Sequence, residues 1–173
     1  MLVDLPAPPP LAWSPARPAH GPALADLRAE VLRPSLERLG RYDDARVRTF
    51  FLTRFVPAGT RVLTGPDGLA GSLALRPADD GVWIEHFYLH AAVQGRGLGT
   101  RVLRAVTAAA DASGTTLRLD VLQRSDARRL YERHGFTLDH EDAVDAYLVR
   151  PAVAPVRPPA PDRRSGGAAA PAG

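Results

Sequence analysis

The sequence predicts an α/β protein of the α+β kind, with a mixed, mostly antiparallel sheet of six or seven strands flanked by about four helices. Three observations lead to this prediction. A strand-like run at 83–89 passes through a glycine-rich turn into a helix-like run that ends at 110. Two strand-like runs precede it and are joined by short turns. After it, strand-like and helix-like runs alternate.

Length and composition favour one domain. At 173 residues the chain can bury a single core, and the absence of Cys excludes disulfides and thiolate chemistry. No apolar run reaches the roughly 18 residues that a membrane span needs, and the N-terminus shows no export signal. We therefore expect a cytoplasmic protein without a membrane partner.

The formal charge of +3 has two sources. All 22 basic residues are Arg, and the tail from Pro151 contains three of them against one Asp. The rest of the chain then carries only about +1, too little to favour nucleic acid as a partner.

The first elements are expected to be a short edge strand at 11–16 and a helix from Ala23. Proline inside a helix removes a backbone donor and clashes with the preceding turn. We therefore expect Pro34 to kink or break this helix before Gly40 ends it.

A second helix is expected from Asp43 and Asp44 through Phe55, since acidic residues are favourable at the positive end of a helix. Its apolar face would consist of Val47, Phe50, Phe51 and Phe55. Strands at 60–64 and 69–75 follow, and turns at 66–68 and 78–81 join them to the strand at 83–89. These three strands should form an antiparallel meander.

The second half predicts the central helix, a strand, a closing helix and two last strands. Apolar residues recur every fourth position from Leu98 to Ala110, and 117–121 alternates as a strand does. A helix should follow Ser125 and stop at Gly135, with strands at 136–138 and 146–149.

The turn at 94–100 is suited to binding an anion, because a helix N-terminus presents unpaired N–H groups and partial positive charge. A nucleoside-triphosphate loop would need a Lys, and the chain has none. A dinucleotide-binding turn fits poorly, because Thr100 replaces its third glycine and the preceding strand belongs to a meander.

A third pattern, Q-x-x-G-x-G, is matched by Gln94, Gly97 and Gly99, and the segment 125–136 reads S-D-A-R-R-L-Y-E-R-H-G-F. With both motifs in this order and spacing, the chain resembles the acetyl-CoA-dependent N-acetyltransferases of the GNAT superfamily. The resemblance implies a GNAT fold at 11–150, between a flexible proline-rich N-terminus at 1–10 and a disordered tail at 151–173.

The same resemblance implies transfer of an acetyl group from acetyl-CoA to a primary amine, by direct attack in a ternary complex. It assigns acetyl-CoA binding to the end of the central strand, the turn and one position near the closing helix: Leu89, His90, Gln94, Gly95, Arg96, Gly97, Leu98, Gly99, Thr100 and Arg124. Arg124 stands where the family often has Asn. A longer acyl group, and a non-catalytic acyl-CoA-binding regulatory module, are the alternatives.

Acyl transfer to an amine is helped by a proton donor near the sulfur and a base near the amine. By the resemblance, Tyr131 is the donor. Glu85 is the candidate base, since it lies in an otherwise apolar strand where burial would raise the pKa of a carboxyl. The alternatives are a solvent-facing Glu85, a base at His86 on the opposite face of the strand, or no dedicated base.

No metal site is expected. His86 and His90 would lie roughly 13 Å apart along a strand, too far to share an ion. The acceptor, a small-molecule or peptide amine, is left open, although Asp43 or Glu30 could hold a cationic amine. Homodimers are common in the family that the chain resembles, so a homodimer is included among the expected partners.

Overall fold

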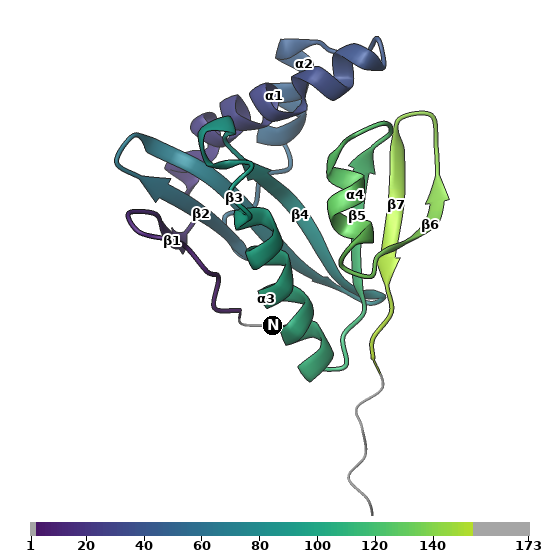
Figure 1. Ribbon diagram of the computed structural model, residues 1–173. Helices are drawn as coiled ribbons and strands as arrows, with labels where there is room; N and C mark the ends of the chain where they lie inside the picture. Colours follow the sequence, from purple (N-terminus) through teal and green to yellow (C-terminus); the bar gives the residue numbers. More distant parts are fainter. Residues whose placement is uncertain (1–2, 154–173) are drawn as a thin grey trace, which may run out of the picture.

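The computed structural model describes residues 3–153. It contains seven strands, four α-helices and two short 3-10 turns (Figure 1). The strands are β1 Ala12–Pro15, β2 Thr60–Gly65, β3 Gly68–Ala78, β4 Gly81–Leu89, β5 Leu117–Leu122, β6 Thr137–Glu141 and β7 Asp145–Arg150. The helical elements are η1 Pro18–His20, α1 Gly21–Arg38, α2 Asp44–Leu52, η2 Ala91–Val93, α3 Leu98–Ala112 and α4 Ala127–Glu132.

The strands form one mixed sheet in the order β1-β2-β3-β4-β5-β7-β6. The predicted meander is confirmed, because β2, β3 and β4 pair antiparallel, with β1 at the edge. Among the strands of residues 3–153, the only parallel pairing joins β4 to β5, through Val82 with Leu117 and Trp83 with Arg118. Beyond these pairs the two strands diverge, as Figure 1 shows.

The helices cover both faces of the sheet. On one face the apolar side of α3 packs with Tyr131 of α4 into the largest core cluster, with Val102, Leu103 and Val106 fully buried. On the other face α1 and α2 bury Leu24 and Phe51 against β2 and β4. Each such side chain contributes about 1.5–3 kcal/mol to folding. The diverging ends of β4 and β5 therefore lie between two packed layers.

Pro34 lies inside α1, which runs unbroken from Gly21 to Arg38, so the expected break is wrong. A proline removes one hydrogen bond from the helix, but packing can outweigh that loss. The turn after it is anchored because Leu36 is buried in a cluster with Val47 of α2 and Leu122 of β5.

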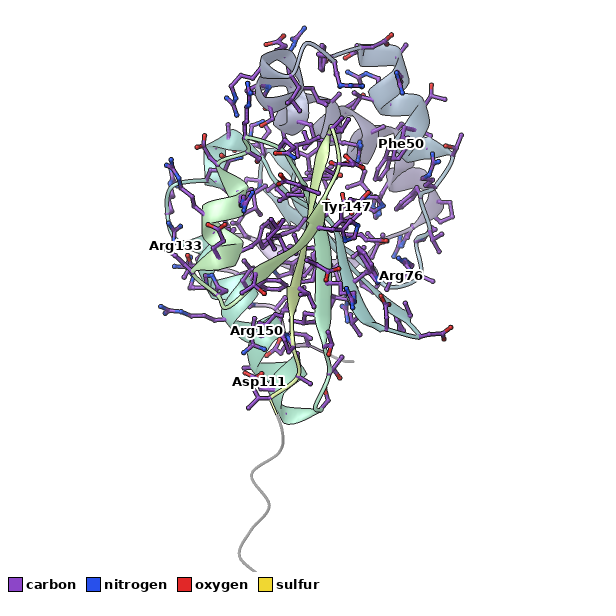
Figure 2. All side chains as sticks on the ribbon, turned by 90° about the vertical axis from the view of Figure 1, so that its right-hand side faces the viewer. Phe50, Arg76, Asp111, Arg133, Tyr147 and Arg150 are labelled. Atoms are coloured by element: carbon purple, nitrogen blue, oxygen red, sulfur yellow. The ribbon has the colours of Figure 1, made fainter. Side chains whose placement is uncertain are left out.

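Phe50 does not belong to the buried face of α2, which is a second correction. Its ring is 44% exposed, whereas Val47 and Phe51 are buried. The guanidinium groups of Arg54 and Arg28 lie 3.9 and 5.1 Å from the ring centre, and cation–π contact compensates for the exposure. Figure 2 shows Phe50 beside the helices at the top of the molecule.

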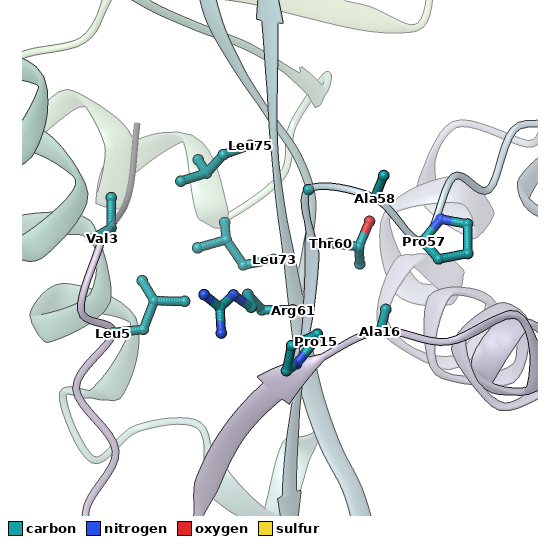
Figure 3. A pocket seen from close by; sticks show the side chains of 11 residues that line it. Val3, Leu5, Pro15, Ala16, Pro57, Ala58, Thr60, Arg61, Leu73 and Leu75 are labelled. Carbon is teal, nitrogen blue, oxygen red and sulfur yellow. The ribbon is translucent and has the colours of Figure 1, made fainter.

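Residues 3–10 lie against the core without forming a helix or strand. Trp13 anchors this segment, because its Nε1–H donates a hydrogen bond to the Pro6 carbonyl at 3.2 Å. A cavity of about 390 Å³ separates this segment from β2 and β3 (Figure 3), and its lining includes Val3, Leu5, Arg61, Leu73 and Leu75. Flexibility at 1–10 stays a prediction. The tail at 154–173, expected to be disordered, lies outside the described residues.

An ion pair joins the far end of the sheet to α3. Arg150 of β7 donates to both carboxylate oxygens of Asp111, at 2.7 and 2.8 Å, and to the carbonyl of His134. The bonds from Arg150 lower the pKa of Asp111. Figure 2 shows both side chains at the lower end of β7, away from the diverging strand ends. None of the helices formed by residues 3–153 is both long and apolar enough to span a membrane.

Candidate active site

The glycine-rich turn leads from η2 into α3. Gly95 and Gly97 have φ angles of +71° and +74°, in the left-handed region where a side chain is strained. Gly97 is the N-cap residue of α3, so the chain turns sharply just before the helix begins.

Six consecutive backbone N–H groups, from Gly95 to Thr100, have no acceptor among the described residues. Three of them belong to the first turn of α3, where no carbonyl is available one turn earlier. The first bond into the helix is Arg101 N–H to the Gly97 carbonyl, at 3.0 Å. The row of donors, at the positive end of a helix, suits a phosphate group. We call residues 95–100 the amide cradle.

The amide cradle is held against the end of β4. The Gln94 side chain donates to the Leu89 carbonyl at 2.6 Å. A side chain at Gly99 would begin 3.3 Å from Leu130 of α4 and 3.6 Å from Leu89 of β4. Glycine therefore allows β4, α3 and α4 to approach one another at this point. The turn, the diverging strands and the closing helix meet there.

Two predicted coenzyme-binding residues, His90 and Arg124, lie outside the amide cradle. His90 accepts a bond from Ala92 N–H through Nδ1, and its Nε2 lies 3.4 Å from a carboxylate oxygen of Glu30. Arg124 follows β5 with a φ of +59°, and its carbonyl accepts a bond from Arg38 at 3.2 Å. Arg38 thus ties α1 to the backbone that precedes α4.

Tyr131 lies on α4 with 7% of its surface exposed. Its ring packs edge-on against Phe136, with ring centres 5.9 Å apart. None of residues 3–153 makes a hydrogen bond to its hydroxyl. Burial raises the pKa of Tyr131 far above its ordinary value, and the nearby Tyr88 and Asp120 add to the shift. The group is therefore a protonated donor with no partner within the described chain.

A bulge in β4 changes the predicted positions of Glu85 and His86. The register against β3 shifts by one residue here, and His86 has a φ of +51°. Ile84 and Phe87 both face the α3 core, so Glu85 and His86 between them face the other side together. The prediction that His86 lies on the opposite face from Glu85 is therefore wrong. The His86 ring packs edge-on against Phe51, 4.8 Å away.

Glu85 pairs with Arg76 of the neighbouring strand, with the charged atoms 2.9 Å apart and the Glu85 side chain 28% exposed. The arginine also lies over the ring of Trp83. Burial lowers the pKa of His86, although the Glu85 charge acts in the opposite direction. At neutral pH His86 is uncharged within an aromatic cluster.

The sequence analysis missed a polar group on the same face. Arg28 of α1 donates to the Tyr88 hydroxyl at 2.8 Å, and its Nε lies buried without a partner among the described residues. Burial raises the pKa of Tyr88. Asp120 of β5 and Asp145 of β7 lie near Arg28. One residue of this group could have been found from the sequence. Asp120 is an acid between the apolar residues Leu119 and Val121, and alternation along a strand turns its side chain away from the core.

Asp145 is expected to weaken the fold at neutral pH. Loss of hydration, the Asp120 charge and the Asp142 charge raise its pKa to about 6, against the influence of Arg28. Between an unfolded pKa of about 4 and this value, the native state binds more protons, so the free energy of unfolding falls as pH rises. Asp145→Asn should therefore be more stable than wild type by about 1–2 kcal/mol at pH 7, with no gain below about pH 4.

Urea unfolding at several pH values between 4 and 8 measures this gain. Asp67→Asn, in the exposed β2–β3 turn, is the matched control and should show none. A gain for Asp145→Asn that is the same at every pH would contradict the assigned pKa.

Within residues 3–153, no three His, Asp or Glu side chains are grouped so that they could hold one metal ion. Asp43 caps α2 by accepting a bond from Arg46 N–H at 2.9 Å, so its carboxylate is already engaged. Glu30 faces His90, near the amide cradle.

Residues 58–138 match the family model described as the acetyltransferase (GNAT) domain. The chain carries a GNAT domain. The matched range includes the meander, the amide cradle, the diverging strands and the helix with Tyr131, so it contains both sequence motifs. No curated protein sequence matches the chain.

Solved structures share the GNAT fold at low identity. PaiA N-acetyltransferase from Thermoplasma acidophilum, in complex with coenzyme A, is 13% identical with a TM-score of 0.65, over 82% of this chain and 98% of that one. An acetyltransferase from Thermus thermophilus is 21% identical with a TM-score of 0.60, over 82% and 96%. An N-acetyltransferase from Staphylococcus aureus is 18% identical with a TM-score of 0.59, over 80% and 99%.

Proposed function

We propose that this GNAT domain is an N-acetyltransferase that transfers the acetyl group of acetyl-CoA to a primary amine by direct attack in a ternary complex. The observation that carries the proposal is the row of six unpaired N–H groups in the amide cradle. It lies at the end of β4, beside the divergence from β5. The coenzyme A complex of the T. acidophilum protein supports the choice of coenzyme.

The amide cradle fits a pyrophosphate because it offers several donors within one turn and no side chain at Gly95, Gly97 or Gly99. Arg96, within the amide cradle, and Arg124, which follows β5, would add positive charge. The strand end at Leu89 and His90 would hold the pantetheine arm. The thioester supplies an activated acyl group and a sulfur leaving group.

Tyr131 would protonate the departing sulfur. Its phenol stays protonated at neutral pH, and none of the described residues competes for its hydrogen. The hydroxyl is not fully enclosed by the described residues, so a bound ligand can accept its hydrogen bond. A thiolate is a better leaving group when a proton is delivered to it.

Glu85 stays a predicted base. It pairs with Arg76, so its replacement is compared below with that of another arginine-paired carboxylate. If Glu85 accepts the amine proton, Glu85→Gln should lower kcat by about 10²-fold at pH 7, with a smaller loss at higher pH where the amine is already neutral. The measurement is kcat between pH 6 and 9.5. Glu37→Gln, an exposed carboxylate of α1 that also pairs with an arginine, is the control. A normal pH–rate profile in Glu85→Gln would remove Glu85 from the reaction.

CoA release on mixing acetyl-CoA with a panel of amines and peptides tests the proposed activity. Steady release, with acceptors ranked by kcat/KM, would support an enzyme for a small-molecule or peptide amine. Tight acetyl-CoA binding without release across the panel would favour the acyl-CoA-binding regulatory module. The same panel with propionyl-CoA and longer acyl-CoA substrates tests the preference for acetyl.

The homodimer also stays a prediction. Light scattering at several protein concentrations measures it, and a single monomer mass throughout would contradict it.

A further inference from the structure

Asp120 has no role in the reaction proposed above. It lies in β5, where Leu117, Leu119 and Val121 face the α3 core, so its side chain projects to the opposite face of the sheet. That face also carries Tyr88, Glu85 and His86 from β4. Asp120 is just beyond the last β4–β5 pair, where the strands have begun to diverge.

Asp120 is exposed to solvent as a residue, and its carboxylate is close to several protein charges. Partial loss of hydration raises its pKa, the Glu85 charge raises it further, and the Arg28 charge lowers it. Because the side chain keeps contact with water, an incoming amine can reach it. None of residues 3–153 makes an ion pair or side-chain hydrogen bond with Asp120.

Asp120 belongs to β5, the strand that leads into α4 and Tyr131, whereas Glu85 belongs to β4. The charge of Asp120 also contributes to the raised pKa of Tyr131. Glu85 is held by Arg76, on the far side of β4 from β5. An amine that attacks a thioester beside Tyr131 would therefore have Asp120 as the nearer free carboxylate.

The groups that face Asp120 determine how it titrates. Arg28 contributes a positive charge from α1. The other facing groups are acidic or phenolic and come from β4, α4, the β6–β7 turn and β7: Glu85, Tyr88, Tyr131, Asp142, Asp145 and Tyr147. With one arginine against several carboxylates, the surroundings attract a cation. An acceptor that arrives as an ammonium ion matches this charge.

We propose that Asp120, in place of Glu85, is the catalytic base that binds the ammonium form of the acceptor and takes its first proton. This role rests on the proposed acetyltransferase activity. After the proton has moved to Asp120, the nitrogen lone pair forms the C–N bond and the C–S bond breaks. The departing sulfur takes the Tyr131 proton, and the second nitrogen proton restores Tyr131. Asp120 then releases its proton to water, so an amide, a thiol and one proton are formed.

Asp120→Asn tests this role, because it keeps the size of the side chain and removes its basicity. For a strongly basic alkylamine, kcat/KM should fall about 10²-fold at pH 7. The loss should shrink as pH rises, because solution then supplies the neutral amine. For aniline, which is neutral at pH 7, the variant should keep wild-type kcat/KM within about threefold. Asp120→Glu should recover part of the alkylamine activity.

The controls separate this role from others. Asp67→Asn makes the same chemical change in an exposed turn and should leave both acceptors unaffected. An equal loss for alkylamine and aniline in Asp120→Asn would overturn the base role, as would an unchanged pH–rate profile. If wild type releases no CoA with any amine, the failure is that of the proposed activity itself. Far-UV circular dichroism of each variant checks that the fold is retained.

Discussion

Replacing Tyr131 by Phe is expected to lower kcat by about 10²-fold or more, while the affinity for acetyl-CoA changes by less than about twofold. The substitution removes only the hydroxyl, which has no partner among the described residues. The ring and its edge-on packing against Phe136 remain, so the fold should tolerate the change. A loss confined to kcat would assign the hydroxyl to the chemical step.

The measurement pairs steady-state kinetics with calorimetric titration of acetyl-CoA. Tyr42→Phe is a suitable control, since the Tyr42 hydroxyl bonds Asp44 at the exposed start of α2. The control should retain wild-type kcat. An unchanged kcat in Tyr131→Phe would reduce Tyr131 to a packing residue of α4.

Gly81→Ala is expected to destabilise the protein by about 3 kcal/mol or more, lowering Tm by roughly 6–12 °C. Gly81 has a φ of +134°, and a Cβ there would lie 2.4 Å from the Thr116 carbonyl oxygen. Val82 N–H donates to that same carbonyl at 2.9 Å, next to the β4–β5 pairing. The added methyl would push apart the two strands where they are joined.

Gly114→Ala is the control that separates backbone strain from the steric clash with Thr116. Gly114 also has a positive φ, of +59°, but a Cβ there would meet nothing within 4 Å. It should cost only about 1 kcal/mol, the backbone penalty alone. Thermal unfolding of both variants gives the comparison. Equal losses would show that contact with Thr116 adds nothing to the backbone penalty.

Elements with strong local signals were predicted well from the sequence. The meander, α3 and the closing helix follow from periodicity and turn residues, which act over a few positions. The predicted burial of Phe50 and the break considered at Pro34 were wrong, because distant contacts decide both environments. Leu36 is held by Val47 and Leu122 after the proline, and arginines cover the exposed Phe50 ring.

The candidate site also has one part that the sequence predicts and one part that it does not. The amide cradle is visible in the sequence because a helix start leaves its first N–H groups unpaired whatever surrounds it. The lack of Lys excludes a nucleoside-triphosphate loop, and the paired motifs at 94–99 and 125–136 carry the resemblance that implies acetyl-CoA. The acceptor side has no comparable local signature.

The sequence by itself therefore determined the strand–turn–helix unit, and its resemblance to the GNAT superfamily predicted the coenzyme class and Tyr131 as the candidate donor. Only the tertiary structure decided which side chains gather on the face of β4 and β5 that α1 covers. The β4 bulge turned His86 to the side of Glu85, and folding brought Arg28 to Tyr88 from 60 residues away. The physical reason is that backbone donors at a helix start arise from local geometry. The charge and hydration of Asp120 depend on strands and helices that meet only in the folded chain.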